Sequence, residues 1–306
     1  MAIRQRRKGM KALQQGLTAF RKARLLSRHP DVTVLVPKKK LGGAIYILPN
    51  LITTGNLFFG FFSIVKGLQG NFLWASGAIL LAAIFDVLDG RVARMTKSTS
   101  EFGVQYDSLC DLVSFGLAPA LLMYQSGLNE LGRLGWIVCF LFLACGALRL
   151  ARFNVQSSIG KASGDFTGLP IPMAAGVVAC FVALWSGFET KPDDIQILQV
   201  LEKLLHDKTF RLTYVAISGF LLAMAMVTNI PYRSHKTLKI QGIKPFRLLV
   251  IGVAVVSLVA MQPELLGFLI FFGYALSGPV EWLLGWTKLV DDDDIFESGG
   301  PHHLDS

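Results

Sequence analysis

Residues 86–111 read DVLDGRVARMTKSTSEFGVQYDSLCD, an acidic stretch that lies between two strongly apolar runs. Asp86 and Asp89 end the first run, while Asp107 and Asp111 fall early in the second. Spacings of three and four residues place each pair on one face of a helix. We therefore expect a helical hairpin, with its turn between the two pairs, in which the four carboxylates meet at one depth.

The composition predicts an integral membrane protein. Of 306 residues, 52% are hydrophobic, and the mean hydropathy is +0.50, which argues against an ordinary water-soluble globular fold. Apolar stretches suited to membrane spans run over residues 45–65, 71–94, 103–125, 134–152, 171–188, 210–229, 247–261 and 264–285. The seventh stretch is short, and Gln262-Pro263 separates it from the eighth. The predicted fold class is an all-α integral membrane protein, a polytopic bundle of about eight transmembrane helices (six to eight).

The distribution of charge predicts how the chain is oriented. Residues 1–40 hold twelve Lys and Arg against Asp31 alone, and residues 231–247 are basic as well. The segments 126–133 and 189–209 are neutral or acidic. Because cytoplasmic loops carry the excess of basic residues, we expect a multi-pass protein of the inner cell membrane with both termini and the aspartates on the cytoplasmic side.

The sequence divides into four predicted segments. Residues 1–44 form a basic cytoplasmic arm, in which an amphipathic helix at 10–28 lies in the membrane interface. This arm suits an anionic lipid surface better than a nucleic acid, so no nucleic acid partner is expected. Residues 45–230 form the membrane domain, and residues 231–286 hold a basic loop and the last two spans. Residues 287–306 form an acidic tail without a packed core.

The aspartates require compensation, because a carboxylate inside a span costs about 2.5–3.5 kcal/mol. A divalent cation is the obvious compensator, and ligands that are all oxygen favour a hard ion such as Mg²⁺, Mn²⁺ or Ca²⁺. No histidine falls in the predicted spans, which argues against zinc. Carboxylate-held cations at headgroup depth suit phosphoryl transfer. Gly90 and Gly103 leave space beside the acids for a substrate, although small residues also pack membrane helices.

A family resemblance rests on eight positions, Asp86, Asp89, Gly90, Ala93, Arg94, Gly103, Asp107 and Asp111. Their spacing matches the signature of the CDP-alcohol phosphatidyltransferase family throughout. The resemblance implies an enzyme in which an alcohol attacks a cytidine-diphosphate-linked lipid and CMP leaves. It also implies a homodimer, and one or two ions of Mg²⁺ or Mn²⁺.

The same resemblance assigns roles to the matched positions. Asp86, Asp89 and Asp107 would bind metal, while Asp111 would share a metal and act as the catalytic base. The positions expected to lie against the CDP group are Gly90, Ala93, Arg94 and Gly103.

Three flanking motifs resemble those of the branch of this family that uses serine. They are LPNLITTGNLFFG at 48–60, RLARFN at 149–154 and DFTGLPIP at 165–172. The expected substrates are CDP-diacylglycerol, supplied from the lipid bilayer, and L-serine. Asn50 and Thr54 are candidates for nucleotide binding, although such residues also join membrane helices by hydrogen bonds. Arg149 and Arg152 are candidates for binding serine or phosphate, with anchoring at the cytoplasmic interface as the alternative.

Other functions are also compatible with parts of this pattern. Within the same family, the acceptor could be glycerol 3-phosphate, inositol phosphate or another alcohol. A divalent-cation transporter would also use embedded acids, but we would then expect them to be spread along the membrane depth. A catalytically silent scaffold offers no reason for four embedded carboxylates.

Overall fold

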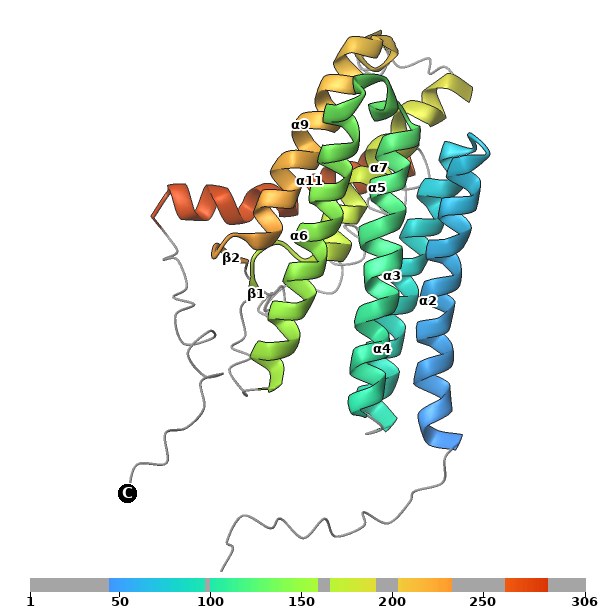
Figure 1. Cartoon of the computed structure of the whole chain (residues 1–306), viewed down its shortest axis with the longest axis vertical. Coiled ribbons are helices and arrows are strands. Elements are labelled where there is room, and N and C mark those ends of the chain that lie inside the picture. The colour runs from blue at the N-terminus through green and yellow to red at the C-terminus, as the bar shows by residue number, and fades with distance from the viewer. Residues whose placement is uncertain (1–43, 97–99, 159–165, 191–202, 233–261, 286–306) are drawn as a thin grey trace, which may run out of the picture. The chain divides into compact units, whose positions relative to one another are not determined.

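The computed structural model describes residues 44–96, 100–158, 166–190, 203–232 and 262–285, and these are mainly helical (Figure 1). The long helices are α2 (Ala44–Leu68), α3 (Phe72–Thr96), α4 (Glu101–Asp111), α5 (Ala118–Gln125), α6 (Arg133–Ser158), α7 (Ile171–Thr190), α9 (Lys208–Val227) and α11 (Pro263–Leu283). A π-helix, η1 (Leu112–Leu117), and a 3-10 helix, η2 (Leu128–Leu131), are also present. Two short strands, β1 (Phe166–Thr167) and β2 (Pro231–Tyr232), pair antiparallel.

The helices are long and apolar enough to confirm a polytopic, all-α membrane protein. Within the described ranges, six candidate spans run over Ile47–Leu68, Phe72–Thr96, Glu101–Gln125, Arg133–Ser157, Lys208–Val227 and Pro263–Leu283. A shorter apolar helix covers Ile171–Gly187. Several predicted segments lie outside the described residues. They are the span 247–261, the amphipathic helix at 10–28, most of the basic loop 231–247 and the acidic tail. Their predictions, and the division into four segments, stay predictions.

Helices α2 and α3 form a tight antiparallel hairpin and pack along each other. The turn closes through two backbone hydrogen bonds, from Gly70 N to Gly67 O and from Asn71 N to Lys66 O, both 2.9 Å long. Gly70 has φ +75, a left-handed conformation in which a side chain would be strained. The hairpin brings the beginning of α2 beside the end of α3, where two of the four aspartates lie.

The third span is a single helical column in three parts, because its middle is the π-helix η1. Pro119, near the start of α5, has no N–H to donate to the carbonyl four residues earlier, which explains why the regular helix is interrupted here. The sequence predicted a span over 103–125, and the column Glu101–Gln125 is long and apolar enough to be one. The π-helix begins directly after Asp111, so the wider turn starts at a predicted catalytic residue.

Helix α7 lies at the centre of the packed core. Almost every residue from Ile171 to Trp185 is buried, and α7 contacts α3, α9 and α11. By contrast, large apolar side chains on α2, such as Leu51, Phe58 and Phe61, are exposed. Exposed apolar side chains on a long apolar helix are expected where lipid replaces water as the solvent. The buried sides of the helices therefore form the core, and the exposed apolar sides fit a bilayer.

The DFTGLPIP loop is held against the end of α9. Gly168 donates to Ile230 O at 2.9 Å, and β1 pairs with β2 through Phe166 and Tyr232. Gly168 has φ +78, and an added Cβ would lie 2.5 Å from the Met226 carbonyl oxygen. This loop therefore requires glycine both for its backbone conformation and for its close approach to α9.

We expect Gly168→Ala to lower the thermal unfolding temperature in detergent more than Gly70→Ala does. Both positions have a left-handed backbone, where a non-glycine residue costs roughly 1–2 kcal/mol. A Cβ at Gly70 would meet nothing within 4 Å, whereas one at Gly168 would collide with backbone. Equal losses in the two variants would show that the loop does not dock on α9 as described.

Candidate active site

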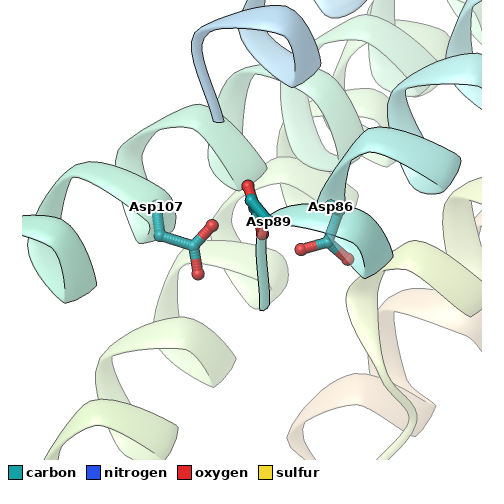
Figure 2. Close-up of side chains that lie close together, drawn as sticks. All are labelled: Asp86, Asp89 and Asp107. Carbon is teal, nitrogen blue, oxygen red and sulfur yellow. The ribbon is translucent and has the colours of Figure 1, made fainter. Parts of the chain in front are cut away.

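Three of the predicted carboxylates converge in the space between α3 and α4. Asp86 and Asp89 come from α3 and Asp107 from α4, and each offers an oxygen within 4.8 Å of the other two. Figure 2 shows the three side chains turned toward one space, with Asp89 between the other two. The helical spacing and the hairpin expected from the sequence thus bring these three residues together.

The chemistry of this cluster fits a divalent metal ion. Asp89 is buried, and its Oδ2 atom and the Oδ1 atom of Asp107 are buried without a hydrogen-bond partner in the described part of the chain. Buried carboxylate oxygens that lack protein donors are costly unless a cation satisfies them. Because every donor is an oxygen, a hard cation is favoured. The cluster can therefore hold a metal ion.

Asp111 lies beside this cluster without belonging to the group of three. It is 8% exposed, and its Oδ1 accepts a 2.9 Å hydrogen bond from Asn56 Nδ2 on α2. Asn56 is itself fully buried, and its backbone oxygen accepts a bond from Ser114 Oγ in the π-helix. The charges of Asp86 and Asp107 are close enough to act on Asp111. Asp111 is thus held in a fixed position at the edge of the cluster of three carboxylates.

A pocket opens on the other side of the cluster. Its cavity volume is about 180 Å³. The residues that line it are Pro49, Asn50, Thr53, Asp89, Gly90, Ala93, Arg94, Ser100, Gly103, Val104 and Asp107. Five of these, namely Asn50, Gly90, Ala93, Arg94 and Gly103, were predicted to bind the CDP group. The pocket and the carboxylates therefore form one continuous site.

Thr54 is the predicted nucleotide-binding residue that does not line this pocket. Its hydroxyl donates to Asn50 O at 2.7 Å and lies 3.0 Å from the Tyr106 hydroxyl. The contact with Tyr106 joins α2 to α4, as the helix-joining alternative expects, and nucleotide binding by Thr54 stays a prediction.

We expect Gly90→Leu to raise the KM for a CDP-linked lipid by about 10²-fold, since small displacements of a substrate cost that much. A Cβ at Gly90 would meet nothing within 4 Å, so the added side chain would project into open space beside the pocket without unfolding the helix. Gly77→Leu, also on α3 and also with nothing within 4 Å, is the matched control. Equal KM values for the two variants would contradict a nucleotide in this pocket.

The two predicted arginines of α6 have different surroundings. Arg149 is 8% exposed, lies close enough to Asp111 and Asp86 for charge interaction, and has a buried Nε without a hydrogen-bond partner among the described residues. Arg152 instead donates to Val227 O at 3.3 Å and to Asn229 Oδ1 at 2.6 Å. Arg149 is therefore available to a ligand near Asp111, whereas Arg152 ties α6 to the end of α9.

Some residues of the site carried little signal in the sequence. Pro49, Ser100 and Val104 line the pocket but were not predicted to bind a ligand. Ser100 caps α4, because its Oγ accepts from Gly103 N at 3.0 Å. A serine three residues before one of the matched glycines could have indicated this cap.

Comparison with known proteins agrees with this geometry. The model of the family described as CDP-alcohol phosphatidyltransferase matches residues 46–230. A "CDP-diacylglycerol--serine O-phosphatidyltransferase" of Helicobacter pylori is 36% identical over 247 residues, covering 80% of this chain and 95% of the relative. An "Archaetidylserine synthase" of Methanothermobacter thermautotrophicus is 43% identical over 136 residues, covering 44% and 57%. The chain belongs to the CDP-alcohol phosphatidyltransferase family.

Proposed function

We propose that the protein transfers the phosphatidyl group of CDP-diacylglycerol to the hydroxyl of L-serine and releases CMP. This proposal rests on the order in which the pocket, the carboxylate cluster and the buried Asp111 and Arg149 follow one another across the site. A pocket lined by the matched Gly90, Arg94 and Gly103 lies on one side of the carboxylate cluster, and a buried carboxylate with a buried arginine lies on the other. The relative from Helicobacter pylori, named for the same reaction, supports the choice of serine.

The nucleotide part of CDP-diacylglycerol would occupy the pocket beside Gly90 and Gly103. Arg94 lines this pocket and can donate to phosphate oxygens, while Asn50 and Thr53 offer polar groups from α2. The pocket reaches Asp89 and Asp107, so the diphosphate would end at the carboxylate cluster. This placement leaves the lipid chains to extend toward the bilayer.

Asp86, Asp89 and Asp107 would hold one or two ions of Mg²⁺ or Mn²⁺. When bound, such an ion neutralises phosphate charge and stabilises the CMP leaving group. Asp111, which the family resemblance also makes a metal ligand, lies outside the group of three and is better placed to take a proton.

The acceptor would bind on the side of Asp111 and Arg149. Asp111 accepts the proton of the serine hydroxyl, and the hydroxyl oxygen forms a bond to the phosphorus that carries diacylglycerol. The bond from that phosphorus to the CMP oxygen breaks, and CMP leaves with the bonding electrons. Arg149 would pair with the serine carboxylate, since a guanidinium binds a carboxylate through two hydrogen bonds.

We also propose that the site faces the cytoplasm at the inner cell membrane. The ends of α3 and α6 and the beginning of α4 lie on one side of the bundle (Figure 1), which is the side that the distribution of basic residues assigns to the cytoplasm. L-serine and CMP are water-soluble, so a cytoplasmic opening suits both. The homodimer remains a prediction from the family resemblance.

An acceptor panel tests this function. The purified protein is incubated with CDP-diacylglycerol, Mn²⁺ or Mg²⁺ and one acceptor, which is L-serine, glycerol 3-phosphate or inositol phosphate, and CMP is measured. We expect CMP release with L-serine alone among the three. Release with a phosphorylated alcohol but not with serine would overturn the choice of acceptor and keep the family reaction.

A divalent-cation transporter is the weaker alternative. The carboxylates gather in one place between α3 and α4 and adjoin a pocket, instead of following the length of a span. A transporter would carry Mn²⁺ into sealed vesicles without CDP-diacylglycerol, which we do not expect here.

A further inference from the structure

Arg149 is a buried cation with unused hydrogen-bonding capacity. In the described part of the chain it is the one basic residue classed as buried, and its Nε has no partner. A guanidinium presents five donors in a planar fork, so its orientation decides which ligand it can hold. The groups that fix this orientation therefore matter for the choice of acceptor.

A phenol from outside the matched family segment lies within range of the charge of Arg149. Tyr274 of α11 is 9% exposed and lies close enough to the guanidinium for their charges to interact. The matched family segment ends at residue 230, more than thirty residues before α11 begins at Pro263. The helix that carries Tyr274 therefore lies outside the matched family segment.

Two contacts with Tyr232 fix the position of Tyr274. The rings of Tyr232 and Tyr274 pack with centroids 5.7 Å apart, and the Tyr232 hydroxyl donates to Ala275 O at 3.1 Å. Gly278, one turn further along α11, lets the Tyr232 ring approach closely, since a Cβ there would overlap it. Tyr232 is fully buried, and β2 joins it to the DFTGLPIP loop.

We propose that Tyr274 is a positioning residue that orients Arg149 toward Asp111 and thereby sets the preference for an acceptor that carries a carboxylate. This inference rests on the proposed function, because it assigns Arg149 to the serine carboxylate. The family domain then supplies the reaction common to all members, and α11 supplies part of the acceptor specificity.

The test is a comparison of acceptor kinetics in Tyr274→Phe and Tyr214→Phe. Tyr274→Phe keeps the ring that packs on Tyr232 and removes only the hydroxyl. We expect the KM for L-serine to rise about tenfold, because a misoriented Arg149 would lose one charge-assisted hydrogen bond to the serine carboxylate, with the KM for CDP-diacylglycerol unchanged. The ratio of transfer to serine over transfer to ethanolamine, which lacks the carboxylate, should fall by a similar factor.

Tyr214→Phe is the matched control. Its hydroxyl is also buried, has no hydrogen-bond partner within the described ranges, and belongs to a ring that packs on Phe268 of α11. We expect wild-type acceptor kinetics from this variant. A merely destabilising effect would lower transfer to serine and to ethanolamine together and would leave their ratio unchanged.

Tyr232→Phe provides a second test that leaves Tyr274 in place. It removes the bond that holds Ala275, so we expect a smaller rise in the KM for serine. The inference is overturned if Tyr274→Phe and Tyr232→Phe both keep the wild-type KM for serine and the wild-type ratio of serine to ethanolamine transfer. That result would leave the proposed function intact. If the wild-type protein releases no CMP with serine, the proposed function itself fails.

Discussion

Replacing Asp111 with asparagine is expected to lower kcat for serine transfer by about 10²- to 10⁴-fold, the range that a positioned general base contributes. Asparagine has almost the same shape but accepts no proton from the serine hydroxyl. Asn56 can keep a hydrogen bond to it by turning its own amide, so the packing between α2 and α4 should survive. The loss should therefore appear in kcat and leave the KM for CDP-diacylglycerol largely unchanged.

The measurement for this variant is steady-state CMP release in detergent micelles at saturating CDP-diacylglycerol. Asp207→Asn is the matched control, because Asp207 caps α9 by accepting from Thr209 N and asparagine also caps well. Near-normal kcat in Asp111→Asn would remove Asp111 from the role of base.

Removal of divalent metal is expected to stop the reaction completely. Chelation with EDTA should reduce CMP release to background, and Mn²⁺ or Mg²⁺ should restore it. Asp89→Asn should weaken Mn²⁺ binding by at least about 10- to 100-fold, the cost of losing even an outer-shell partner of a metal site. The reason is that the Oδ2 atom of Asp89 is buried and needs a cation.

Electron paramagnetic resonance of Mn²⁺ measures this binding without relying on activity. Asp111→Asn is the informative comparison, since Asp111 lies outside the group of three carboxylates, and we expect it to bind Mn²⁺ more tightly than Asp89→Asn does. Wild-type Mn²⁺ affinity in Asp89→Asn, or full CMP release in EDTA, would contradict a metal site at this cluster.

The sequence was sufficient to predict the hairpin and its acids, because both depend on local spacing. Intervals of three and four residues between aspartates fix a helix face, and a turn between two apolar runs brings the faces together. Asp86, Asp89 and Asp107 meet as that argument requires. Gly90 and Gly103 line the pocket for the same reason, since they share these helices.

Partners on distant helices were harder to predict, because they depend on how whole helices pack. Arg149 and Arg152 lie three residues apart in one motif, yet one lies beside Asp111 and the other holds the end of α9. Asn56 was one polar residue among several in the first span, and nothing local indicated its bond to Asp111. Tyr274 is separated from Arg149 by more than a hundred residues, so no spacing rule connects them.

Transfer of labelled L-serine into lipid tests the central claim most directly. The protein is incubated with CDP-diacylglycerol, Mn²⁺ and radiolabelled serine, and both the label in the organic phase and the CMP in the aqueous phase are counted. We predict one labelled lipid for each CMP, and rates of both products lowered together by about 10²- to 10⁴-fold in Asp111→Asn. CMP release without label in the lipid would show hydrolysis or another acceptor and would contradict serine transfer.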